Sequence, residues 1–224
     1  MDLGNFQKEF DNYGKKRYIV EVSPKITGSN FIQEAQELYK IASMDLFISN
    51  FKVETSELKL IYKNALLYFR GDERSEWDLN KGLFIHGGTG SGKSIFFEIF
   101  KKYTAKLNHN SFIQSKQTKI VAEVAKKGIA ELEKYVKDRM PVILYIDDFG
   151  SANSIIQHFG NEFDVMDELI QARYDEFIKS GAITHITTNV KPADFKEKFN
   201  ERITSRMHQM FNVIKFPDKD FRRV

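Results

Sequence analysis

The stretch Gly87-Gly88-Thr89-Gly90-Ser91-Gly92-Lys93-Ser94 matches the phosphate-binding pattern G-x-x-x-x-G-K-[ST] at every fixed position. A short apolar run over residues 82–86 precedes it and predicts a buried strand. Apolar residues at helical spacing follow it and predict a helix from about 93 to 107. Strand, glycine-rich loop and helix are the context in which this pattern binds nucleotides. The sequence therefore predicts a P-loop nucleotide site.

The residue types in this loop suit a nucleoside triphosphate and its metal ion. Glycines let consecutive backbone N–H groups face a phosphate, where the N-terminus of the following helix adds partial positive charge. We expect Lys93 to reach the β- and γ-phosphates and the Ser94 hydroxyl to bind Mg²⁺. ATP and Mg²⁺ are therefore the expected cofactors.

The composition is typical of one α/β domain with a small appendage. Hydrophobic residues make up 42% of the 224 residues, and 34 basic residues stand against 31 acidic ones, so any nucleic-acid surface must be local. The absence of cysteine excludes disulfides and thiolate metal sites. The first ten residues lack the features of a signal peptide, and no apolar run approaches the roughly 20 residues that a membrane span needs. We expect a cytoplasmic protein with no membrane partner.

Predicted strands and helices alternate after the loop, which is typical of a parallel sheet between helical layers. The further strands are expected over 111–114, 142–146, 182–188 and 211–216. The further helices are expected over 116–127, 129–137 and 161–179. Before Trp77 the pattern differs, with a short strand over 17–22 and helices over 31–41 and 57–69. We therefore divide the chain into an N-terminal segment, 1–76, and a nucleotide-binding domain, 77–224.

An acidic pair follows the apolar run 142–146, which predicts a strand buried on both faces. Ligands of open parallel sheets bind at the carboxyl ends of the strands, and the pair stands at such an end. Asp147 suits Mg²⁺ opposite Ser94, and Asp148 suits the orientation or deprotonation of the attacking water. A polar turn after a core strand is the alternative, but the upstream P-loop favours the catalytic interpretation.

The next predicted strand ends in Thr187-Thr188-Asn189. An amide beside the γ-phosphate can hold the nucleophilic water or sense whether the phosphate is present. The alternative is an asparagine that opens a turn before Lys191-Pro192. The position of Asn189, one strand after the acidic pair, favours the functional interpretation.

Arg202 and Arg206 stand four residues apart and share one face of a predicted helix. A guanidinium aimed at the γ-phosphate of a neighbouring subunit would act as an arginine finger. From the spacing alone, two solvated arginines that pair with Glu197 or Glu201 are the favoured explanation. The order of the motifs along the chain instead favours the arginine finger.

That order resembles the DnaC/IstB-type branch of the AAA+ ATPases over residues 77–224. The segments that carry the resemblance are 87–94, 147–148, 187–189 and 202–206, together with the lead-in 78–87 and the run 205–217. It implies an AAA+ core with a five-stranded parallel sheet. Only eight residues follow Phe216, so we expect no full C-terminal helical lid, as in that branch. The resemblance does not extend to residues 1–76.

The resemblance also implies roles for single residues. Asn189 would be the polar sensor of the γ-phosphate, Arg206 a finger acting in trans, and Arg202 a supporting contact to nucleotide. Arg222 stands where a second sensor arginine falls, although Arg223 is equally suitable. The Asp-Asp pair departs from the commoner Asp-Glu, which puts the rate of hydrolysis in doubt. A finger in trans implies that ATP binding drives homo-oligomerisation.

Residues 116–138 fall where initiator and loader ATPases carry a helix pair that touches single-stranded DNA. The candidate DNA contacts are Lys116, Lys119, Lys126 and Lys127, with Gly128 at the bend. Interspersed acidic residues such as Glu123 and Glu131 are equally typical of a solvated helix face. DNA contact is therefore only slightly favoured.

The leading functional prediction is an ATP-hydrolysing helicase loader of the DnaC type, which assembles on single-stranded DNA and binds a replicative hexameric helicase. The alternative within the family is an IstB-type transposition helper that binds duplex DNA and a transposase. A small-molecule kinase is disfavoured because it needs neither Asn189 nor Arg206. A nucleotide-gated binding module with little turnover remains an alternative of another class.

Overall fold

The protein is described by a computed structural model that covers residues 28–48, 51–107, 112–136, 143–158, 160–191, 194–195, 199 and 201–221. The strand expected over 17–22 lies outside these residues. Within them, no helix is long and apolar enough to cross a membrane.

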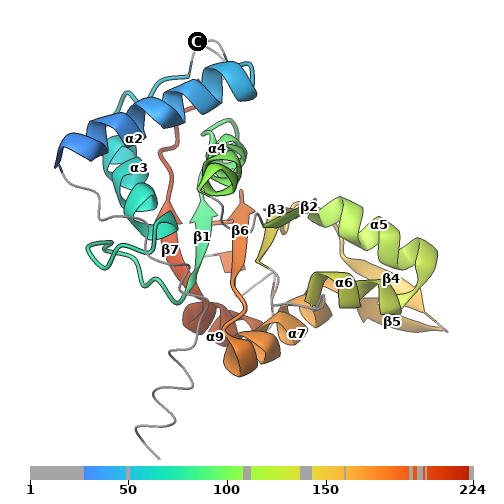
Figure 1. Ribbon diagram of the computed structural model, residues 1–224. Helices are drawn as coiled ribbons and strands as arrows, with labels where there is room; N and C mark the ends of the chain where they lie inside the picture. The colour runs from blue at the N-terminus through green and yellow to red at the C-terminus, as the bar shows by residue number, and fades with distance from the viewer. Residues whose placement is uncertain are drawn as a thin grey trace, which may run out of the picture.

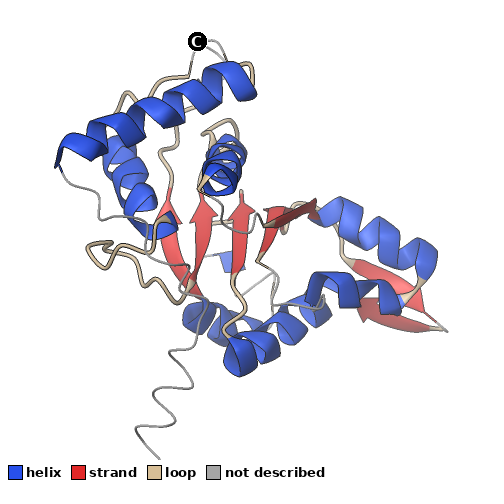
Figure 2. Ribbon diagram, in the orientation of Figure 1, coloured by secondary structure: helices blue, strands red, loops and turns tan. Residues whose placement is uncertain are grey.

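The centre of the molecule is a parallel sheet of five strands (Figure 2). In spatial order they are β2 (Ile113–Lys116), β3 (Leu144–Phe149), β6 (Thr184–Thr188), β1 (Gly82–His86) and β7 (Phe211–Lys215). Every neighbouring pair is parallel. The predicted five-stranded parallel sheet is confirmed. Because all carboxyl ends meet at one edge, the residues that follow the strands gather there.

Helices cover both faces of this sheet (Figure 1), and β1 shows why. Leu83 and Ile85 pack into one apolar cluster, with α2, α3 and α4, while Phe84 packs into the other, with α5, α6, α7 and α9. A strand with apolar side chains on both faces needs such cover on each side. The helices are α2 (Gly28–Lys40), the π-helix η1 (Ile41–Asp45), α3 (Ser56–Phe69), α4 (Lys93–Lys106), α5 (Gln117–Lys127), the 3₁₀-helix η2 (Ile129–Leu132), α6 (Glu133–Val136), α7 (Val165–Ser180) and α9 (Glu201–Met210).

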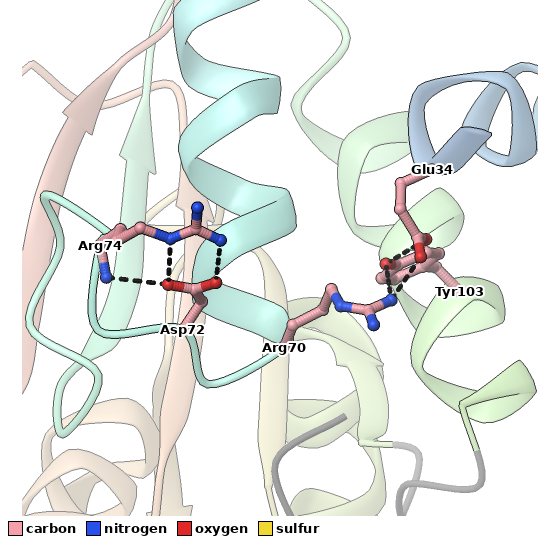
Figure 3. Close-up of polar contacts among 5 residues, drawn as sticks. All are labelled: Glu34, Arg70, Asp72, Arg74 and Tyr103. Atoms are coloured by element: carbon pink, nitrogen blue, oxygen red, sulfur yellow. Dashed lines mark hydrogen bonds and ion pairs between the residues drawn. The ribbon is translucent and has the colours of Figure 1, made fainter. Parts of the chain in front are cut away.

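The described part of the N-terminal segment packs on α4 through apolar side chains. Polar contacts support this packing (Figure 3). Arg70, just after α3, forms an ion pair with Glu34 of α2 at 2.5 Å. The Tyr103 hydroxyl of α4 donates to Glu34 at 2.6 Å and accepts from Arg70 at 3.1 Å. Nearby, Arg74 pairs with Asp72 at 2.5 Å and orders the turn after α3. These contacts join α2, α3 and α4 into one layer.

The helix expected over 161–179 begins later than predicted. Residues 161–164 form β5 (Asn161–Asp164), which pairs antiparallel with β4 (Ile155–His158) as a separate hairpin. Phe163, which falls within the helix expected over 161–179, lies opposite Ile156 in this hairpin. The Asp164 side chain accepts from the N–H groups of Met166 and Asp167 and so caps the N-terminus of α7. The prediction missed this cap.

The helix expected over 129–137 is also irregular. Gly128, with φ of 96°, ends α5, and the chain continues as η2 and the single turn α6. At the other end of the domain, β7 is the last element in the described residues, which end at 221.

Candidate nucleotide-binding site

The glycine-rich loop connects β1 to α4 at the carboxyl edge of the sheet. Gly92, with φ of 90°, precedes the first residue of α4, and Gly90, with φ of 80°, lies against the C-terminal segment. A Cβ atom at Gly90 would stand 2.0 Å from an oxygen of Asp220. Glycine is therefore favoured at Gly90 by its backbone angle, and any larger residue would also displace the Asp220 side chain.

Lys93 begins α4 and turns its ammonium back into the loop. The Nζ atom donates to the carbonyl oxygens of Gly87 at 2.9 Å and Gly88 at 2.7 Å, and to the Ser91 hydroxyl at 3.2 Å. It also donates to Oδ1 of Asn189 at 2.9 Å. The side chain, only 6% exposed, thus stands between the loop and the end of β6. A cation in this place suits the terminal phosphates of a nucleotide.

Asp147 lies on β3, opposite the start of α4. Its Oδ1 atom accepts hydrogen bonds from Ser94 at 2.9 Å, Tyr145 at 2.7 Å and Thr187 at 2.6 Å. The residue is buried, and the three hydroxyl donors hold its carboxylate in one orientation. Burial and the neighbouring Asp147 raise the pKa of the Tyr145 hydroxyl well above its usual value, so Tyr145 stays a neutral donor.

The pair of Ser94 and Asp147 fits Mg²⁺ by the chemistry of its oxygens. Magnesium prefers oxygen ligands, keeps several waters and is held in nucleotide sites by one or two protein groups together with phosphates. The described residues contain no cluster of three or more His, Cys, Asp or Glu side chains that could hold a metal alone. With one hydroxyl and one carboxylate, the pair suits a metal that also takes ligands from phosphates and water.

Asp148 occupies a bulge near the end of β3, where the sequence predicted that the strand had already ended. The register of β3 against β6 shifts between Ile146 and Phe149, and Asp148 has φ of 57°. Its N–H donates to Thr187 Oγ1 at 3.3 Å. Left-handed backbone costs about 1–2 kcal/mol in a non-glycine residue, although Asp tolerates it better than most. Among the described residues, none forms a hydrogen bond or ion pair with its carboxylate.

Arg206 lies on α9, in the apolar layer opposite that of α4. Its guanidinium stands 4.8 Å from the centre of the Tyr174 ring of α7. The Nη1 atom is buried and has no hydrogen-bond partner in the described part of the chain. The structure does not bring Arg206 together with the glycine-rich loop of the same chain. Arg202 lies on the same helix, but its side chain is not among those described, and Arg222 lies outside the described residues.

The four candidate DNA contacts lie at the end of β2 and along α5. Two of them have acidic neighbours: Lys119 lies 4.0 Å from Glu123, and Lys127 lies 3.6 Å from Glu131. Lys134 also binds Glu123 and, with Tyr135, lowers the pKa of that carboxyl to about 2. Within the described ranges, no acidic side chain forms an ion pair with Lys116 or Lys126. The exposed face of α5 therefore carries mixed charge.

Sequence reasoning missed several residues that shape this site. Tyr145 stands two residues before Asp147, so the alternation of a strand puts both side chains on one face. Thr187 donates to Asp147, a contact between two strands that no local pattern around Asn189 indicates. Asp218, after β7, accepts from the Gly88 N–H at 3.1 Å, and no local pattern in the sequence indicates this contact.

Comparison with known proteins finds similar folds among solved structures. No protein-family model and no curated protein matches the chain. Among solved structures, DnaI superposes with a TM-score of 0.54 at 20% identity, over 75% of this chain and 86% of its own. Domain III of the Thermotoga maritima replication initiation protein DnaA superposes with a TM-score of 0.55 at 23% identity, over 74% of this chain and 64% of its own. The DnaC helicase loader superposes with a TM-score of 0.52 at 17% identity, over 75% of this chain and 94% of its own. The predicted fold, a five-stranded parallel sheet with a glycine-rich loop after one of its strands, is therefore shared with DnaI and the DnaC helicase loader.

Proposed function

We propose that this protein is an ATPase of the DnaC-like helicase-loader kind that acts in DNA replication. The observation that supports it best is the arrangement of four side chains at the carboxyl edge of the sheet. Lys93 contacts Asn189, and Ser94 contacts Asp147, each at 2.9 Å. This arrangement stands on a fold shared with DnaI and the DnaC helicase loader.

Each group has a place in the hydrolysis of ATP to ADP and phosphate. The loop N–H groups and Lys93 bind the phosphates, while Ser94 and Asp147 would hold Mg²⁺, which neutralises charge that develops on the phosphates. Asp148 orients a water for attack on the γ-phosphorus and accepts its proton as the bond to the β–γ bridging oxygen breaks. Asn189 holds the water or the γ-phosphate in line.

Arg206 lies on α9, over the Tyr174 ring, and does not contact the glycine-rich loop of its own chain. We therefore propose that several copies assemble. Arg206 of one copy would reach the γ-phosphate bound by the next, with Arg202 and Arg222 as supporting contacts to nucleotide. ATP would therefore drive homo-oligomerisation on single-stranded DNA, with α5 facing the strand. The segment 1–76 would bind the replicative helicase, and 77–224 would be the ATPase domain.

Co-elution with the replicative helicase of the same source, in ATP and Mg²⁺, tests the proposal. We expect a stable complex that weakens when residues 1–50 are deleted and that fails to form with Lys93→Ala. ATP-dependent filaments on duplex DNA without helicase binding would instead support a transposition helper. ATP binding with no phosphate release under any condition would support a nucleotide-gated binding module.

A further inference from the structure

The ring of Tyr174 lies against the Arg206 guanidinium, between the neighbouring helices α7 and α9 (Figure 1). The Cζ atom of Arg206 stands 4.8 Å from the centre of this ring. Among the residues that the structure describes, none forms a hydrogen bond or ion pair with Arg206, and its buried Nη1 atom has no acceptor. A buried donor in this state calls for an explanation of its own. The position of the guanidinium therefore depends on the ring.

Tyr174 is itself fixed relative to the sheet. The preceding residue, Arg173, is fully buried and donates to the Thr184 hydroxyl at 2.9 Å and to the Ile183 carbonyl at 2.6 Å, where β6 begins. On the side of α9, the Tyr174 hydroxyl donates to Gln209 Oε1 at 2.9 Å. Arg173 therefore anchors this turn of α7 to the sheet, and the hydroxyl of the next residue joins the ring to α9.

The backbone that carries Arg206 is also held in place. Three residues of α9 pack into the apolar cluster that α7 joins: Ile203, Met207 and Met210. Helix α9 ends at Met210 and β7 begins at Phe211, so no loop separates the helix from the sheet. A fixed backbone leaves the long arginine side chain many rotamers of its own. The ring contact is therefore what restricts the guanidinium.

An arginine that lies on a ring can still bind a phosphate. The guanidinium is planar and its five N–H groups lie in that plane, so a ring on one face blocks none of them. The attraction between cation and ring involves no hydrogen bond that would have to break when the arginine moves. A side chain that is already ordered also loses less freedom on binding than a mobile one. The contact with Tyr174 therefore suits an arginine that acts on a neighbouring copy.

We propose that Tyr174 is a positioning residue for the arginine finger: its ring orders the Arg206 guanidinium in the free protein, so that the finger enters the site of a neighbouring copy with less loss of side-chain freedom. This inference rests on the proposed function, in which Arg206 acts in trans. The ring carries the role, and the hydroxyl does not. Because Tyr174 acts through Arg206, its substitution should matter in the copy that supplies the finger and not in the copy that supplies the nucleotide site.

Mixed assemblies test this by placing the same substitution on either partner. Arg206→Ala supplies a nucleotide site without a finger, and Lys93→Ala supplies a finger without a working site, so phosphate release by their mixture is the reference. Tyr174→Leu added to the Lys93→Ala partner should lower this release about tenfold, equal to about 1.4 kcal/mol. Tyr174→Leu added to the Arg206→Ala partner is the matched control and should stay within about twofold of the reference. Tyr174→Phe keeps the ring and should stay within about twofold on either partner.

The Nε–H proton resonance of Arg206 gives a readout that does not depend on activity. A proton held over the face of an aromatic ring is shifted upfield by the ring current. We expect this shift in the wild type and in Tyr174→Phe. In Tyr174→Leu the resonance should move to the position of a solvated arginine. Its disappearance in Arg206→Ala assigns the resonance.

The outcomes separate this inference from the proposed function. A wild-type protein that does not hydrolyse ATP, or an inactive reference mixture beside an active wild type, contradicts the proposed function and the role of Tyr174 with it. An active reference mixture that Tyr174→Leu leaves unchanged on the finger partner contradicts the inference alone. Equal losses on both partners, together with a lower melting temperature, would show that Tyr174 only supports the packing of α7 and overturn the inference.

Discussion

The ammonium of Lys93 donates to the side-chain oxygen of Asn189 across 2.9 Å. This contact joins the loop after β1 to the residue that follows β6, and the two strands are neighbours in the sheet. The order of the strands in the sheet therefore brings together two side chains that are 96 positions apart in the sequence.

The two partners should fail in different ways when they are truncated. Lys93→Ala removes the cation that binds the phosphates, and we expect at least a tenfold loss of ATP affinity, equal to about 1.4 kcal/mol or more. Asn189→Ala leaves the loop intact and should keep affinity within about threefold while turnover falls about 100-fold, as when one polar transition-state group is lost. Nucleotide titration and phosphate release measure the two effects. Equal losses of affinity in both variants would contradict the division of roles.

The Tyr145 hydroxyl should tune the magnesium requirement. Tyr145→Phe removes one of three donors to Asp147 Oδ1 while the ring keeps its stacking on Phe97, whose centroid is 4.2 Å away. We expect the Mg²⁺ concentration for half-maximal turnover to rise about threefold to tenfold, since a lost outer-shell partner commonly weakens a metal site by 10-fold or more. The measurement is turnover against Mg²⁺ at fixed ATP.

Tyr103→Phe is the matched control for this change. It removes a hydroxyl from the same kind of buried ring, but that hydroxyl binds Glu34 and Arg70 in the N-terminal layer. Its Mg²⁺ requirement should equal that of the wild type, while the free energy of unfolding decreases by about 1 kcal/mol. A similar shift in both variants would mean that the effect of Tyr145 is not local to Asp147.

Much of this architecture follows from the sequence because the strands are short, continuous apolar runs. The strand before the loop was predicted with its observed bounds, since a buried parallel strand needs apolar residues on both faces. The end of β3 was not predicted correctly, because the bulge at Asp148 depends on contacts with Thr187 and Thr188, which are distant in sequence. The hairpin before α7 was missed since its apolar residues also fit helical spacing. Long-range contacts of single side chains, such as Gln117 with Gly150, leave no local pattern.

Acid should destabilise the protein through His185. This residue is fully buried on β6, where its Nδ1 atom accepts from the Leu83 N–H at 3.1 Å, and burial, together with Arg173, lowers its pKa to about 3. In the unfolded chain its pKa is about 6.5, so between these values the unfolded state binds a proton that the folded state does not. The contribution of neutral His185 to the free energy of unfolding is therefore full above about pH 6.5. It falls by about 1.4 kcal/mol per pH unit as the pH decreases toward 3.

The comparison of wild type with His185→Asn isolates this effect from the carboxylates. Asparagine offers an acceptor oxygen to the Leu83 N–H but does not titrate. Urea unfolding at several pH values between 4 and 7 should show a slope for the wild type that is steeper by about one proton than that of the variant. Parallel slopes would show that His185 is protonated in the folded state.

Arg206 should act on a neighbouring copy rather than on its own site. Its guanidinium lies over the Tyr174 ring, and its buried Nη1 lacks a partner among the described residues. We expect Arg206→Ala to bind ATP normally, to lose turnover by about 1,000-fold, as for a missing arginine finger, and to cost only about 0.5–1 kcal/mol of stability from the ring contact. Gln209→Ala, on the same helix, removes a hydrogen bond to Tyr174 and should keep turnover.

Mixing two inactive variants tests whether the finger acts between copies. Arg206→Ala keeps an intact loop, and Lys93→Ala keeps an intact finger, so a mixed assembly contains sites in which both are present. Equal amounts of the two should recover a substantial part of wild-type phosphate release, whereas Lys93→Ala mixed with Lys93→Ala/Arg206→Ala should recover none. Recovery requires contact between copies, so it should vanish on dilution below the assembly concentration. A mixture that stays inactive at every concentration would place the role of Arg206 within its own chain.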